Sequence, residues 1–107
     1  AREHFGCESL RRVPLEEAGG DGSAFSHWDA REFHTEIMAP SISDFARFSK
    51  ITMALLEDSG WYKPDYSLAG PFHFGERKGC SFLSEDCVSN GVTSFPDTFC
   101  TNMDVKD

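Results

Sequence analysis

The four cysteines, Cys7, Cys80, Cys87 and Cys100, are the feature that most limits what this chain of 107 residues can fold into. An even number of cysteines in so short a chain favours an oxidising compartment and disulfide bonds. Four cysteines allow three pairings, and the spacing alone leaves all three open. No two of them form a C-x-x-C pair, which argues against a zinc knuckle or a thioredoxin-like redox site.

Length and charge restrict the class of protein further. With 39% hydrophobic residues the chain can form one small domain, although a domain of this size buries only about 60 to 70% of the surface of its unfolded chain. Its net charge of −8 would repel phosphate backbones and anionic membranes, which argues against nucleic acid as a partner. The excess of acidic residues is interpreted as a solvated surface.

Neither a membrane span nor a signal peptide is visible. No run of about 18 apolar residues occurs. Residues 1–5 lack the basic start and the apolar run of a secretory signal, so we expect any targeting segment to have been removed or to lie outside this sequence.

The spacing of apolar residues predicts one clear helix, from about Ser43 to Ser59. Ser41 or Ser43 can cap its first turn. Gly60 can leave the helix in a left-handed conformation, and Pro64 prevents the helix from resuming. The residues that repeat at helical spacing are Phe45, Phe48, Ile51, Thr52, Leu55 and Leu56.

Most of the remaining chain is predicted to be loop. Residues 19–23 are too rich in glycine for a helix or strand and should be exposed. Residues 25–40 follow neither helical nor alternating spacing, and residues 61–75 are interrupted by proline and glycine. The tail after Cys80 is rich in turns, and we expect it to lack enough apolar neighbours to bury Val92, Phe95 and Phe99 by itself.

The residue types alone do not define an activity. No G-x-S-x-G motif is present to hold an activated serine, and nothing marks two carboxylates as a facing pair. The pair Glu16 and Glu17 is interpreted as solvated surface. A single histidine is more often structural than a metal ligand, and the chain has His4, His27, His34 and His73.

Two motifs that follow one another in the sequence indicate more about function than the residue types do. Residues 22–31, with the sequence GSAFSHWDAR, and residues 35–40, with the sequence TEIMAP, resemble the leishmanolysin family of surface metalloproteases. The likeness extends over nearly the whole chain. It also takes in residues 4–7, 51–62, 79–82 and 91–100, which read HFGC, ITMALLEDSGWY, GCSF and GVTSFPDTFC.

The resemblance implies a metzincin zinc site. In that family two histidines of an H-E-x-x-H helix and a third, distant histidine bind one zinc ion above a methionine turn. His27 matches the third ligand, and Met38, eleven positions later (38 − 27), matches the supporting methionine. No H-E-x-x-H occurs in these 107 residues. The other two histidines and the general-base glutamate are therefore expected upstream, and this segment alone is expected to be inactive.

The resemblance also implies a disulfide pairing and a pocket. The counterparts of Cys7 and Cys80 pair with each other in the family, whereas those of Cys87 and Cys100 pair further downstream. Here the latter two are expected to be free, mispaired or joined to each other. Ser41 and Ile42 are expected to contribute to the wall of the pocket for the residue after the scissile bond.

The resulting hypothesis is that this chain is part of a zinc metalloendopeptidase that cleaves polypeptides at the cell surface or outside the cell. Whether a lipid anchor follows beyond this segment is left open. The expected fold is α+β, loop-rich and stabilised by a disulfide. Residues 1–84 are expected to form part of the metzincin central domain, and residues 85–107 the start of a cysteine-rich C-terminal domain. The alternative is a non-catalytic, disulfide-held adhesion or interaction module derived from the same fold.

Overall fold

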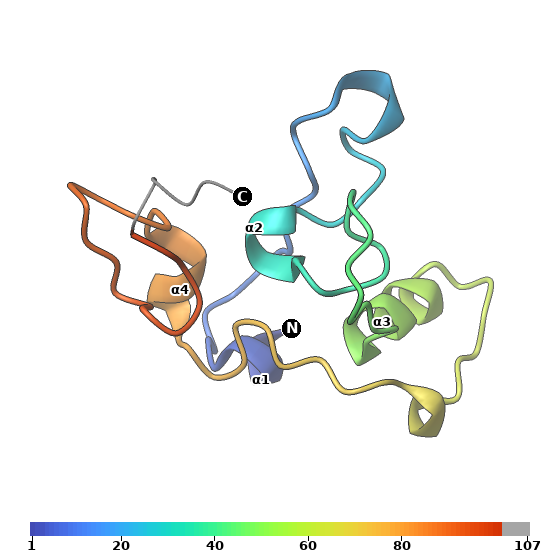
Figure 1. Cartoon of the computed structure of the whole chain (residues 1–107). Helices are drawn as coiled ribbons and strands as arrows, with labels where there is room; N and C mark the ends of the chain where they lie inside the picture. Colours follow the sequence, from blue (N-terminus) through green and yellow to red (C-terminus); the bar gives the residue numbers. More distant parts are fainter. Residues whose placement is uncertain (102–107) are drawn as a thin grey trace.

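The chain is represented by a computed structural model that describes residues 1–101; the last six residues of the expected second domain lie outside them. Figure 1 shows α2 near the middle, with α3 on one side and α4 on the other. Long irregular segments connect these helices. The helical elements are α1 (Arg2–Phe5), the 3-10 turn η1 (Gly20–Gly22), α2 (Ala30–Phe33), α3 (Lys50–Asp58), the 3-10 turn η2 (Tyr66–Leu68) and α4 (Cys80–Ser84).

The β part of the expected α+β fold is wrong for the described residues. Over residues 1–101 no extended strand forms, and backbone pairing is limited to three isolated bridges. These bridges join Leu15 to Trp28, Glu36 to Arg47, and Ser89 to Val92. The chain is loop-rich, as expected. None of the helices within residues 1–101 combines the length and the apolar composition of a membrane span.

An aromatic core takes the place of a sheet. The ring of Phe33, on α2, lies 5.6 Å from that of Phe5 and 5.8 Å from that of Phe72. Phe82, on α4, continues the cluster, with its ring 6.1 Å from Phe5 and 5.2 Å from Phe95. Phe5, Phe33 and Phe82 are fully buried. Because burying each such side chain contributes roughly 1.5 to 3 kcal/mol, this cluster is the main apolar contribution to stability.

Gly75 makes room for this aromatic packing. Its φ of +72° lies in the left-handed region. A Cβ at this position would come within 2.5 Å of a Phe82 ring carbon and 2.9 Å of a Phe5 ring carbon. The backbone of residues 74–76 can therefore approach the core only because residue 75 lacks a side chain.

The predicted helix from Ser43 to Ser59 is too long at its start. Helix α3 begins at Lys50, and its N-cap is Ser49, whose side chain accepts a hydrogen bond from the amide of Thr52. The segment before it pairs with residues 35–37 instead: the amide of Arg47 donates to the carbonyl of Thr35 at 2.9 Å. These tertiary hydrogen bonds replace the helical ones, and Phe45 remains 70% exposed.

Residues 25–40 contain a helix that the apolar spacing misses. Asp29 caps α2 by accepting a hydrogen bond from the amide of Arg31 at 2.9 Å. Glu32 stands three positions after the cap, so the sequence has the D-x-x-E order of a capping box. The cap, rather than the hydrophobic spacing, was the signal for this single turn.

The tail after α4 is held by the core of the preceding residues. Phe95 is buried, Phe99 packs against the core cluster, and Val92 is 68% exposed. The guanidinium of Arg31 lies 4.7 Å and 4.5 Å from the ring centroids of Phe82 and Phe99. Phe95 is thus buried with the help of Phe82 on α4 rather than by the tail alone.

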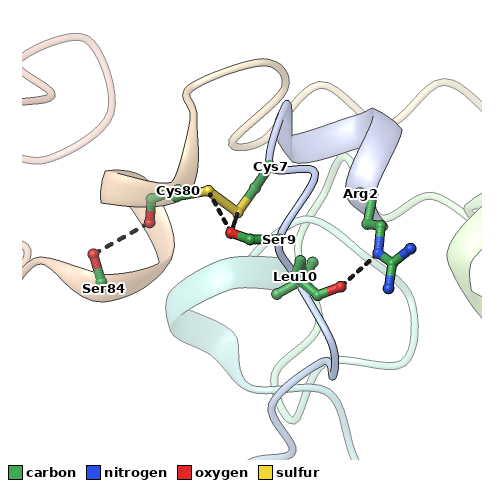
Figure 2. The surroundings of a disulfide bond; sticks show 6 residues. All are labelled: Arg2, Cys7, Ser9, Leu10, Cys80 and Ser84. Atoms are coloured by element: carbon green, nitrogen blue, oxygen red, sulfur yellow. Dashed lines mark hydrogen bonds between the residues drawn. A yellow bond between two sulfur atoms is a disulfide. The ribbon is translucent and has the colours of Figure 1, made fainter.

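A disulfide joins Cys7 to Cys80, the pair that the family resemblance implies. It connects the residues after α1 to the first residue of α4, two points 73 positions apart in the sequence (Figure 2). The hydroxyl of Ser9 lies beside both sulfur atoms, at 3.6 Å from Cys7 and 3.5 Å from Cys80. Cys87 and Cys100 are free thiols.

Candidate functional site

His27 lies where three backbone segments meet. Its carbonyl accepts a hydrogen bond from the amide of Glu16 at 2.9 Å, and the carbonyl of Glu16 accepts one from Phe25 at 2.8 Å. The next residue, Trp28, donates its amide to the carbonyl of Met38 at 3.1 Å. The hydrogen bonds of its neighbours thus fix the backbone of His27 and connect it directly to the predicted methionine turn.

Two hydrogen-bond partners lie beside Nδ1 of the His27 ring. Nδ1 lies 3.1 Å from the carbonyl oxygen of Ser23 and 2.9 Å from the hydroxyl of Ser26. When Nδ1 donates its hydrogen to the Ser23 carbonyl oxygen, which can only accept, Nε2 of the neutral ring carries the lone pair. Nε2 has no hydrogen-bond partner among residues 1–101, and the residue is half-buried.

This arrangement suits a metal ligand. Metal-binding histidines usually donate the other ring N–H to a carbonyl, carboxylate or water, which fixes the ring and directs the lone pair at the metal. The carbonyl oxygen of Ser23 lies where it can accept such a bond from Nδ1 of His27. The chemistry of its donor atom therefore fits one nitrogen ligand for zinc.

Met38 lies close to His27 along the backbone but is turned to the core. Its carbonyl accepts the Trp28 amide, and its partly buried side chain packs against the core cluster. The following residue, Ala39, is buried, whereas Ser41 and Ile42 are exposed, Ile42 at 99%. The turn therefore has an anchored first half and a second half that projects into solvent.

Glu16 stabilises the loop that carries His27, a role that its interpretation as solvated surface missed. One carboxylate oxygen accepts hydrogen bonds from the amides of Glu17 and Ala18, at 3.1 and 3.0 Å, and the other accepts one from Ala30 at 3.2 Å. These hydrogen bonds, that of Ala18 first, hold the pKa of Glu16 below its usual value. In the sequence, the acidic pair Glu16 and Glu17 did not indicate this role of Glu16.

Glu36 is a second carboxylate that the sequence did not single out. Its side chain is 1% exposed and lies between the methionine turn and α3. One oxygen accepts a hydrogen bond from the amide of Met38 at 2.6 Å. The other accepts from the amide and hydroxyl of Ser49, at 3.0 and 2.9 Å, and from the hydroxyl of Thr52 at 2.5 Å. Four donors thus satisfy this buried carboxylate.

The described residues do not complete a metal site. Within residues 1–101 no three histidine, cysteine or acidic side chains lie close enough together to hold an ion. The other histidines lie elsewhere: His4 stacks on Phe72, and the exposed His73 pairs with Glu76. A cavity of about 340 Å³ beside α1 and α3 is lined by His4 and His73, and neither His27 nor Met38 lines it.

Comparisons with known proteins identify the family. All residues, 1–107, match the family described as Leishmanolysin. Over 98% of its length the chain is 43% identical to the leishmanolysin of Leishmania donovani, of which it covers 18%. It is 44% identical to a leishmanolysin homolog of Crithidia fasciculata over 94% of this chain and 15% of that protein. It is 45% identical to a leishmanolysin-like peptidase of Drosophila pseudoobscura pseudoobscura, over 81% of this chain and 13% of that protein.

The chain thus spans less than a fifth of the length of these relatives. The match over the full chain and the identity of 40% or more confirm the resemblance to the leishmanolysin family. The chain belongs to the leishmanolysin family of zinc metallopeptidases.

Proposed function

We propose that this chain is one part of a zinc metalloendopeptidase, in which His27 supplies the third zinc-binding nitrogen. The observation that carries the proposal is the ring of His27, whose Nδ1 is bonded to the Ser23 carbonyl while Nε2 remains available. Two further histidines and a general-base glutamate would come from an H-E-x-x-H helix upstream. Zinc, when bound, makes water a nucleophile near neutral pH.

Met38 supports the site from below rather than binding the metal. Its carbonyl accepts a hydrogen bond from the amide of Trp28, which joins the methionine turn to the residue next to His27. Its partly buried side chain continues the apolar core. In this proposal the thioether limits the movement of the zinc-binding imidazoles, and a polar residue at position 38 would loosen them.

Ser41 and Ile42 follow the turn and are free to contact a substrate. Both side chains are exposed, and an apolar side chain as exposed as that of Ile42 gains by contact with an apolar residue of a polypeptide. We assign these two residues to the wall of the pocket that receives the residue after the scissile bond.

The proposed protein cleaves polypeptides at the cell surface or outside the cell. The Cys7–Cys80 disulfide supports such an oxidising location. Residues 1–84 would form part of the metzincin central domain, and residues 85–107 would begin the cysteine-rich domain, where Cys87 and Cys100 would find partners further along a longer chain. On its own this chain would lack peptidase activity, because His27 is a single ligand.

The test compares this chain with a protein extended upstream through H-E-x-x-H. Zinc stoichiometry and peptide cleavage are measured for both, each as wild type, as His27→Ala and as His34→Ala. His34 is a matched control because it is an exposed histidine of the same segment. We expect one zinc and cleavage only in the extended protein, loss of both in His27→Ala, and retention of both in His34→Ala.

Two results would contradict the proposal. An extended protein that binds no zinc would favour the non-catalytic adhesion or interaction module. Unchanged zinc content and activity in His27→Ala would show that the third ligand is a different residue.

A further inference from the structure

Four hydrogen bonds form a closed ring around the methionine turn. The Trp28 amide donates to the Met38 carbonyl at 3.1 Å, and the Met38 amide donates to Glu36 Oε2 at 2.6 Å. Thr52 Oγ1 donates to Glu36 Oε1 at 2.5 Å and accepts from Trp28 Nε1 at 2.9 Å. The ring of hydrogen bonds thus starts at Trp28, the residue after His27, and returns to Trp28.

The direction of each hydrogen bond in this ring is fixed by chemistry. An indole N–H can only donate, so Thr52 Oγ1 accepts from Trp28 and its single proton is directed to Glu36. A backbone N–H can only donate, so Glu36 Oε2 accepts from Met38. Both carboxylate oxygens of Glu36 therefore accept hydrogen bonds. A side chain that places a donor where either oxygen lies would lose at least one of these hydrogen bonds.

We propose that Glu36 is a positioning residue of the zinc site, because its carboxylate sets the place of Met38 relative to the segment that presents His27. The inference rests on the proposed function and deepens it. Glu36 contacts neither His27 nor, in the proposed site, the metal. It acts through Met38 on one side and through Thr52 and Trp28 on the other.

Burial explains why this link can be stiff. Glu36 and Ser49 are each 1% exposed, Thr52 and Trp28 each 5%. Water does not compete for these hydrogen bonds. A polar atom that moves away from its partner here is buried without a hydrogen bond, which is energetically unfavourable. The methionine turn is thereby joined to the first turn of α3, which Ser49 caps.

Replacement of Glu36 by glutamine keeps the size and changes the hydrogen bonding. An amide has one accepting oxygen and one NH₂ group that only donates. Whichever way it turns, the NH₂ group faces either the Met38 amide or the donors of Ser49 and Thr52. The expected result is a displaced turn in a protein that otherwise retains its core.

Glu32 provides the matched control. It is also a buried glutamate, at 6% exposure, and lies four positions earlier, on α2. Its Oε2 has no hydrogen-bond partner among the described residues. Glu32→Gln is therefore the same chemical change at similar burial, without an effect on the ring.

The experiment measures zinc affinity in the extended protein that carries H-E-x-x-H. The absorption spectrum of the Co²⁺-substituted protein is a second readout, because its bands report the geometry of the ligands. Glu36→Gln is expected to weaken zinc binding about tenfold, the lower end of the range for residues that orient metal ligands, and to change the Co²⁺ spectrum. Glu32→Gln should match the wild type in both readouts.

A second pair of variants covers the case in which Glu36→Gln does not fold. Thr52→Val removes the hydroxyl that links Trp28 to Glu36, whereas Thr52→Ser keeps it. We expect weaker zinc binding in Thr52→Val and near wild-type binding in Thr52→Ser. Near-UV circular dichroism identifies which variants are folded.

The outcomes distinguish failure of the proposed function from failure of the role assigned to Glu36. A wild-type extended protein without zinc overturns the proposed function, and this inference with it. If the wild type binds zinc but folded Glu36→Gln, or folded Thr52→Val, has unchanged affinity and an unchanged Co²⁺ spectrum, the proposed function stands and the role of Glu36 is refuted.

Discussion

Removal of the Cys7–Cys80 disulfide should be the most damaging single covalent change. The two cysteines are 73 positions apart. In the chain-entropy model, opening a loop of this length increases the entropy of the unfolded chain enough to cost about 4 kcal/mol at 25 °C. Small domains have a free energy of unfolding of about 5 to 15 kcal/mol. The double variant Cys7→Ala/Cys80→Ala should therefore lose a large part of its stability.

Urea denaturation followed by tryptophan fluorescence measures this loss. Trp28 is 5% exposed and reports on the core, whereas Trp61, at 84%, is already in solvent. The control is Cys87→Ala/Cys100→Ala, which removes two free thiols and should change the free energy of unfolding by less than about 1 kcal/mol. A loss below about 1 kcal/mol in the Cys7/Cys80 variant, or equal losses in both variants, would refute this reasoning.

Two further predictions concern the core and the buried acid. Gly75→Ala should lower the free energy of unfolding in urea by at least about 2 kcal/mol because its Cβ meets Phe82. Gly60→Ala, at a similar φ of +77° with open space around it, should cost less, and equal costs would contradict this. Burial, and then the charge of Asp29, raise the pKa of Glu32 from 4.5 to about 7. A raised pKa means that the folded state holds the proton more tightly, so stability falls by up to about 3 kcal/mol as pH rises from about 4.5 to 7. Glu32→Gln should remove that fall, and an unchanged slope between pH 5 and 8 would contradict it.

Part of the fold could be predicted from the sequence. Apolar spacing located the main helix, and Gly60 and Pro64 located its end within one residue, since α3 ends at Asp58. The start was wrong because Phe45 and Phe48 have helical spacing but lie in a segment whose backbone pairs with residues 35–37. Such pairing depends on residues distant in the sequence, which spacing does not report.

The candidate site, too, could be predicted only in part from the sequence. The family motifs predict His27 as a zinc ligand and Met38 as its support, whereas the residue types alone leave both among ordinary candidates. The orientation of the His27 ring depends on the carbonyl of Ser23, four positions away in a turn that the glycines of residues 19–22 allow. Nothing in the sequence singled out Glu36, because a glutamate is normally exposed. Its burial follows from donors on α3, which only the folded chain brings together.

The most direct test of the account is the number of imidazole ligands on zinc. X-ray absorption at the zinc edge counts nitrogen ligands at about 2.0 to 2.1 Å. In the protein extended through H-E-x-x-H we predict three imidazoles on the zinc, and loss of the zinc when His27 is replaced by alanine. Three imidazoles in both proteins, or a wild type with only two, would contradict the assignment of His27 as the third ligand.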